Sequence, residues 1–139
     1  MSNLGTLPAA RLLVIEDDEA VQILMKAIFQ RHGMAVDSAG DGDTALDRLR
    51  RTSYDAVILD LMVPGPNGFE IIHEMKSRER ALLERTIVLT AASDATLRHF
   101  TDGQLVRRVM RKPFDLDEFV AEVLALTPGA FPSEMHVVH

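Results

Sequence analysis

The feature that most constrains the fold is a short, entirely apolar run at residues 56–59 that ends at the carboxylate of Asp60. Residues 61–68 follow with two prolines, two glycines and an asparagine, so regular structure is expected to stop there. A short apolar run bounded by turn residues is typical of a strand buried in a parallel sheet. Because ligands bind at the carboxyl ends of strands in open α/β sheets, Asp60 lies where a charged group can act.

Similar runs recur along the chain and alternate with segments of helical periodicity. Strands are predicted at residues 12–15, 34–39, 56–60, 86–90 and 106–111. Apolar residues at helical spacing predict helices near residues 20–32, 44–50, 69–75 and 115–126, whereas residues 94–104 are polar and carry only a weak helical signal. Five strands alternating with helices predict an α/β fold, a parallel sheet with helices on both faces.

The chain of 139 residues fits one domain, which we place at residues 11–126. Residues 1–10 are predicted to be a flexible lead-in, and residues 127–139, which contain two prolines and a glycine, a C-terminal tail. No internal repeat or second domain is visible.

Composition excludes several classes of protein. The chain has no cysteine, which rules out a disulfide framework and thiolate metal ligands and favours a cytoplasmic location. Its net charge of −6 argues against nucleic acid as the main partner. No apolar stretch is long enough to span a membrane, so no membrane partner is expected.

Chemically capable residues follow the predicted strands at their carboxyl ends. Asp17 and Asp18 follow the first strand, and Asp60, Thr90 and Lys112 end or follow the third, fourth and fifth. In a parallel sheet these ends share one edge, where three carboxylates would repel one another unless a cation joined them. Oxygen ligands without Cys or His favour a hard ion such as Mg²⁺. An acid beside Mg²⁺, a lysine and a hydroxyl is a plausible nucleophile toward a phosphoryl group.

Five motifs in this order make the chain resemble a response-regulator receiver domain, of the stand-alone kind related to chemotaxis regulators, over about residues 11–126. Each motif alone is weak, and their order and spacing together are specific. They are Asp17-Asp18 after a strand, Asp60 before a Pro-Gly turn, Gly68, Thr90-Ala91, and Lys112-Pro113-Phe114.

The resemblance implies a flavodoxin-like three-layer sandwich with a five-stranded parallel sheet of order 2-1-3-4-5. It also implies the site. Asp60 would be the phosphoacceptor, and Mg²⁺ would be the cofactor. The implied metal ligands are Asp17, Asp18, Asp60 and the backbone carbonyl of Met62; the implied phosphoryl-binding and switch residues are Thr90, Ala91 and Lys112, with a cis peptide between Lys112 and Pro113.

Two positions depart from the pattern that receivers follow. The aromatic switch residue expected three positions before the lysine is replaced by Val109, whose side chain is too short to swing between buried and exposed positions. The Ala-Gly-Ala stretch expected before the fifth strand is also missing, and Gly103 lies nearer the fourth strand than the family's glycine. The sequence therefore supports phosphorylation at the site better than it supports the usual conformational switch by which receivers report that phosphorylation.

The leading hypothesis is a stand-alone receiver that takes a phosphoryl group from a histidine kinase or a histidine phosphotransfer protein and signals by protein–protein contacts or phosphorelay. It would be no enzyme beyond its own phosphorylation and dephosphorylation, and a monomer or weak homodimer. The alternative is a pseudo-receiver that acts as a scaffold or dimerisation module, motivated by Val109. A Mg²⁺ phosphatase of the Asp-x-Asp type is disfavoured because Met62 occupies the position of its second acid.

Overall fold

The computed structural model describes residues 9–127, so the predicted lead-in and tail lie almost entirely outside the described residues. All strands of the described part are parallel and form one sheet of order β2-β1-β3-β4-β5, which confirms the predicted topology. The fifth strand starts later than residue 106, where the sequence placed it. The strands are β1 (Arg11–Ile15), β2 (Ala35–Ala39), β3 (Ala56–Asp60), β4 (Thr86–Thr90) and β5 (Arg108–Arg111).

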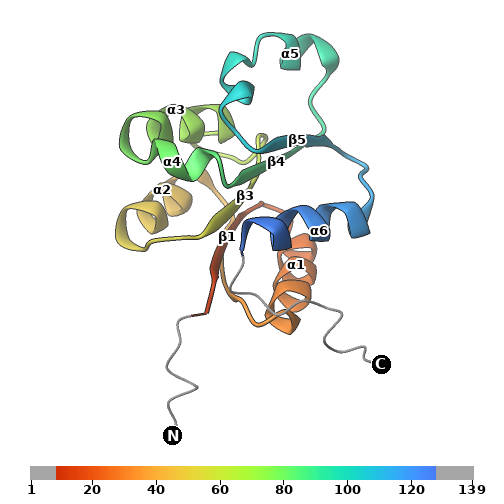
Figure 1. Ribbon diagram of the computed structural model, residues 1–139. Coiled ribbons are helices and arrows are strands. Elements are labelled where there is room, and N and C mark those ends of the chain that lie inside the picture. Colours follow the sequence, from red (N-terminus) through yellow and green to blue (C-terminus); the bar gives the residue numbers. More distant parts are fainter. Residues whose placement is uncertain (1–8, 128–139) are drawn as a thin grey trace, which may run out of the picture.

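Helices cover both faces of the sheet, as predicted (Figure 1). One face carries α1 (Glu19–Arg31) and α6 (Leu116–Leu126), and the other carries α2 (Gly42–Arg51), α3 (Gly68–Arg78) and the four-residue α4 (Arg80–Leu83). The remaining helix, α5 (Asp94–Arg98), lies beyond the β4–β5 end of the sheet and is followed by a 3₁₀ turn, Thr101–Gln104.

The sheet separates two apolar cores because successive side chains on a strand point to opposite faces. On β1, Leu13 and Ile15 belong to the core beneath α2 and α3, and Leu12 and Val14 belong to the core beneath α1 and α6. Every residue of β3 and β4 is buried, as expected for central strands covered on both sides. The end of β3 is therefore a rigid place for a functional side chain.

Short polar caps start the helices that surround the sheet. Side chains of Asp18, Asp41, Asn67, Ser93 and Asp115 each accept a hydrogen bond from a backbone amide of the first turn that follows. No sequence pattern predicted α4, which has no side-chain cap and follows α3 directly at Glu79. Among the helices described, none has the length and apolar character needed to cross a bilayer.

Candidate functional site

Asp60 is the last residue of β3 and is almost fully buried, with 5% of its surface exposed. One carboxylate oxygen accepts a hydrogen bond from the Met62 amide at 2.9 Å, and the other accepts one from Lys112 Nζ at 3.1 Å. A buried carboxylate is costly unless it is paired, and both of its oxygens have a donor here. The sheet thus holds the Asp60 carboxylate in a defined orientation at its carboxyl edge.

The loop after Asp60 is held at both ends by backbone hydrogen bonds. The Gly68 amide donates to the Leu61 carbonyl at 3.0 Å, and the Gly42 amide donates to the Pro64 carbonyl at 2.9 Å. Gly68 has no room for a side chain, because a Cβ there would lie 2.5 Å from Leu61 Cα. The start of α3 and the start of α2 therefore fix the loop that borders the acid.

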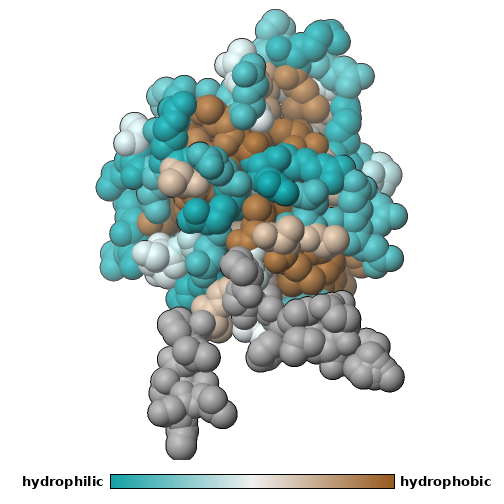
Figure 2. All heavy atoms as spheres, viewed as in Figure 1, coloured by the Kyte–Doolittle hydropathy of each residue, from teal (hydrophilic) through white to brown (hydrophobic). Residues whose placement is uncertain are grey.

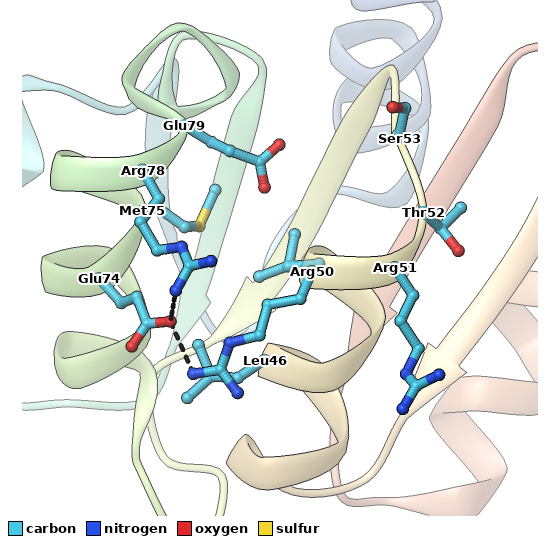
Figure 3. A pocket seen from close by; sticks show the side chains of 10 residues that line it. Leu46, Arg50, Arg51, Thr52, Ser53, Glu74, Met75, Arg78 and Glu79 are labelled. Carbon is cyan, nitrogen blue, oxygen red and sulfur yellow. Dashed lines mark hydrogen bonds and ion pairs between the residues drawn. The ribbon is translucent and has the colours of Figure 1, made fainter.

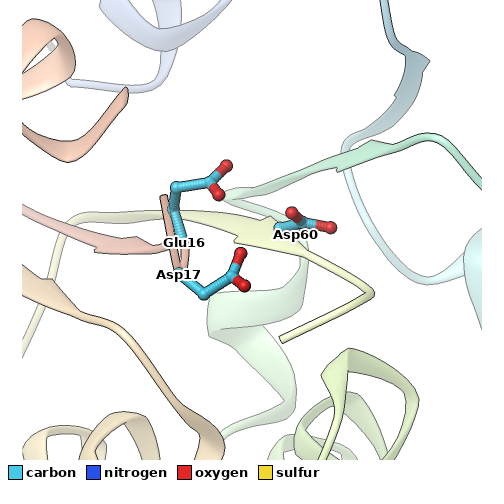
Figure 4. Close-up of side chains that lie close together, drawn as sticks. All are labelled: Glu16, Asp17 and Asp60. Carbon is cyan, nitrogen blue, oxygen red and sulfur yellow. The ribbon is translucent and has the colours of Figure 1, made fainter. Parts of the chain in front are cut away.

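Two more acids point toward Asp60 from the end of β1 (Figure 4). Carboxylate oxygens of Glu16, Asp17 and Asp60 lie within 4.8 Å of one another, with Glu16 and Asp60 buried and Asp17 exposed. Three oxygen donors without sulfur or imidazole match the ligands of a hard divalent cation such as Mg²⁺. These three residues could hold such an ion while leaving its other positions to water or a phosphoryl oxygen.

The structure gives Asp18 a helix-capping role, and metal binding by Asp18 stays a prediction. Its carboxylate accepts hydrogen bonds from the amides of Ala20 at 2.9 Å and Val21 at 3.2 Å, so it caps α1. Within the described residues the three-acid cluster contains Glu16 instead. Two signals pointed that way: Glu16 is the first residue after the strand, and an Asp just before a helical run is a typical N-cap.

Lys112 joins the two buried acids from the end of β5. Its ammonium lies 3.1 Å from Asp60 and 3.2 Å from Glu16. Partial burial by itself would lower the pKa of Lys112, but hydrogen bonds and charge from Asp60 and Glu16 outweigh it and raise the pKa above its ordinary value. The lysine therefore stays protonated. The Lys112–Pro113 peptide bond is cis, the geometry that the resemblance implied.

For Glu16, burial outweighs the hydrogen bonds and positive charge around the carboxyl group. Burial raises the pKa of its carboxyl group, and nearby Asp60 adds to this, while the Asp18 amide and Lys112 oppose it. The Asp18 amide donates to Glu16 at 2.9 Å. Three carboxylates against one ammonium leave the cluster net negative, which favours a cation.

Thr90 ends β4 on the neighbouring strand and is fully buried. Its Oγ1 accepts a hydrogen bond from the Ala92 amide at 2.9 Å. Ala91 is exposed between them. The β3–β4 register pairs Asp60 with Leu89, so Thr90 lies one residue farther along the adjacent strand and at the same sheet edge.

The remaining predicted positions lie around this edge. Met62 is 60% exposed beside Asp60, and metal binding by its carbonyl stays a prediction. Val109 is half-buried and packs against the core beneath α2 and α3, as does Phe100 from the segment after α5. Phe100 meets the Phe69 ring edge-on, with centroids 5.1 Å apart. The sequence prediction did not identify Phe100, because no periodic pattern surrounds it.

Comparison with known proteins agrees with this geometry. The family model of the response regulator receiver domain matches residues 12–124. The chain is 32% identical over 123 residues to the transcriptional regulatory protein TcrA of Mycobacterium tuberculosis, covering 88% of this chain and 48% of that protein. It is 33% identical over 121 residues to the transcriptional activator protein PfeR of Pseudomonas aeruginosa, covering 87% and 39%. The chain thus spans about half the length, or less, of these curated relatives.

Solved structures give the same result. The response regulator TrrA of Thermotoga maritima, crystallised in complex with Mg²⁺ and BeF, is 31% identical and superimposes with a TM-score of 0.73, covering 84% of this chain and 98% of that one. The non-phosphorylated HemR receiver domain of Leptospira biflexa is 28% identical with a TM-score of 0.72, covering 84% and 93%. On the sheet order, the acidic edge and the match over nearly all the described residues, the chain belongs to the response regulator receiver domain family.

Proposed function

We propose that Asp60 accepts a phosphoryl group from a phosphohistidine of a kinase or phosphotransfer protein, with Mg²⁺ held by Glu16, Asp17 and Asp60. The observation that carries this proposal is the buried Asp60 carboxylate, tied to Lys112 and within 4.8 Å of two further acids. The Mg²⁺ and BeF bound by the related TrrA protein support it.

In this reaction an Asp60 oxygen forms a bond to phosphorus while the P–N bond of phosphohistidine breaks, and the electron pair stays on the imidazole nitrogen. Lys112, held protonated by its two acidic neighbours, offsets negative charge on the phosphoryl oxygens. The buried Thr90 hydroxyl can donate to one of those oxygens. Bound Mg²⁺ supplies further positive charge and orients the phosphoryl group. The chain's own contribution is to orient and desolvate the acid.

The downstream role is also a proposal. We infer that added charge at Asp60 shifts a two-state equilibrium that a protein partner reads, either directly or as one step of a phosphorelay. The relatives named as transcriptional regulators are more than twice as long as the match, so their role in transcription is said of them alone. A stand-alone cytoplasmic monomer or weak homodimer stays our prediction for this chain.

Incubation with Mg²⁺ and acetyl phosphate or beryllofluoride tests the assignment. With acetyl phosphate we expect the intact protein to gain one phosphoryl mass, and with either reagent we expect its Thr90 and Ala92 amide resonances to shift. The Asp60→Asn variant should show neither change. If wild-type resonances stay unchanged, the chain is a pseudo-receiver, the alternative that Val109 favours.

A matched pair of variants tests which acids bind the metal. Glu16→Gln should weaken Mg²⁺ binding by at least about tenfold, the lower end of the range expected for losing a group that supports a metal site. Asp18→Asn should leave Mg²⁺ affinity nearly unchanged, since Asn is also a good helix N-cap. Titration of amide resonances with Mg²⁺ measures both. Equal losses in the two variants would contradict the placement of Glu16 in the site.

A further inference from the structure

Arg111 and Lys112 are consecutive residues with partners on different parts of the molecule. Lys112 reaches the acids of the site, whereas Arg111 contacts the segment between β4 and α5. Arg111 Nη1 lies 2.8 Å from an Asp94 carboxylate oxygen, and Nη2 donates to the Ala92 carbonyl at 3.2 Å. Arg111 therefore contacts both the first residue of α5 and Ala92, which lies just before the N-cap of that helix.

Ala92 is held from both sides of its backbone. Its amide donates to Thr90 Oγ1 at 2.9 Å, and its carbonyl accepts from Arg111. A Thr90 hydroxyl that turned toward a phosphoryl group on Asp60 would have to leave the Ala92 amide or carry Ala92 with it. Arg111 opposes the second route because it fixes the Ala92 carbonyl.

Few other contacts hold this segment. The helix α5 has five residues and buries none of them, and it stands apart from the helices that cover the sheet (Figure 1). Figure 2 shows polar residues over most of the visible face, with apolar ones between them beneath this segment. Its other described anchors include the partly buried Leu97 against the core beneath α2 and α3, Phe100 against Phe69, and an ion pair of 3.1 Å between Asp102 and Lys76.

We propose that Arg111 is a positioning residue, which holds Ala92 and thereby keeps the Thr90 hydroxyl in its resting direction until Asp60 is modified. The proposal rests on the proposed function, because it concerns how Thr90 becomes available to the phosphoryl group. It also assigns a coupling between the site and α5 in a chain whose position 109 is the short Val109. Arg111 acts through Ala92, and its described partners are Ala92 and Asp94 and not the acids of the site.

Substitution of Arg111 measures this restraint. Arg111→Met should free Ala92 and favour the state in which Thr90 faces Asp60. Beryllofluoride with Mg²⁺ should then bind more tightly, by about twofold to fivefold, the size expected for loss of an exposed ion pair and one hydrogen bond. Arg111→Lys, which keeps the charge, should restore part of the wild-type affinity.

Arg108→Met is the matched control. Arg108 is on the same strand and loses the same charge, but its ion pairs are with Glu118 and Glu122 of α6. The affinity of the Arg108→Met protein for beryllofluoride should equal that of the wild type. An unchanged or weaker affinity in Arg111→Met, or the same gain in Arg108→Met, would overturn the proposal.

Amide hydrogen exchange without beryllofluoride separates this proposal from the proposed function. In Arg111→Met the Ala92 amide should exchange several-fold faster, while α3 and α6 exchange as in the wild type. Unchanged Ala92 exchange overturns the role of Arg111. If wild-type protein binds no beryllofluoride, the proposed function fails, and the exchange of Ala92 alone decides whether Arg111 holds it.

Discussion

The helices that follow β3 and β4 leave the same edge of the sheet and are built in contrasting ways. After Asp60 comes α3, with eleven residues, a capping box between Asn67 and Glu70 and four buried positions. After Thr90 comes α5, with five residues, a simple Ser93 cap and no buried position. Local stability follows buried apolar contact, so the side that carries the acid is rigid and the side that carries the hydroxyl is easier to move.

The largest test of this contrast removes apolar volume from each helix. Ile72→Ala on α3 should lower the free energy of unfolding by about 3 kcal/mol, because Ile72 is fully buried and its loss leaves a cavity. Leu97→Ala on α5 should cost less than about 1 kcal/mol, since Leu97 is only partly buried. Urea unfolding followed by circular dichroism measures both. Equal costs would contradict the view that α5 is lightly held.

A pair of glycines gives a smaller and more local test. Gly68→Ala should destabilise the fold by about 2 kcal/mol, because the new Cβ would lie 2.5 Å from the Leu61 backbone beside Asp60. Gly103→Ala, after α5, should cost less than about 0.5 kcal/mol, since its Cβ would meet only the Phe100 ring, at 3.1 Å, and that side chain can shift.

Thermal melts of the two glycine variants, each compared with the wild type, measure the difference in their loss of stability. Gly68→Ala should also weaken Mg²⁺ binding, because it displaces the loop after Asp60. Preserved Mg²⁺ affinity in a destabilised Gly68→Ala protein would show that this loop does not position the metal ligands.

The smallest effect concerns Tyr54, which precedes β3 on the rigid side, and it shows as a loss of stability only at alkaline pH. Burial and its hydrogen bond of 2.7 Å to Asp37 raise the pKa of Tyr54 to about 12. A phenol that loses its proton less readily when folded contributes stability fully below the unfolded pKa of about 10. That contribution is lost as pH rises from about 10 through 12.

Tyr54 is the only tyrosine and the chain has no tryptophan, so its ionisation can be followed directly by ultraviolet absorbance. Native protein should titrate near 12, and urea-unfolded protein near the ordinary value of about 10. In Tyr54→Phe the alkaline fall in stability over this range should be absent. A native titration near the unfolded value would mean that the contact between Tyr54 and Asp37 of β2 is looser than the structure indicates.

The strands could be predicted from the sequence because strand ends are sharply marked, and the resemblance to receiver domains implied their order. A buried strand leaves an apolar run, and Asp60 and Lys112 come where such runs stop, so topology alone brings them together. The Asp17-Asp18 pair was ambiguous by one residue, since an acid there can bind a cation or cap α1. Only the geometry separates the two, through the hydrogen bonds from Ala20 and Val21 to Asp18.

The segment between β4 and β5 resisted prediction for a different reason. Its order comes from contacts distant in sequence, such as Phe100 with Phe69 and Asp102 with Lys76, and not from periodicity. Grooves on the surface could not be predicted from the sequence either. The groove of about 290 Å³ between α2 and α3 is crossed by a Glu74 carboxylate shared between Arg50 and Arg78, and no sequence motif marks it (Figure 3).

The ammonium of Lys112, shared by Asp60 and Glu16, makes assembly of the site depend on folding of the whole sheet. Its two hydrogen bonds join residues 96 and 52 positions apart in the chain, from the beginning, middle and end of the domain. The acid therefore has its positive partner only after β5 has joined the sheet, the last strand to be synthesised. A chain in which β5 has not joined the sheet lacks this ammonium beside Asp60, so the proposed phosphoryl uptake would require the whole sheet to be assembled.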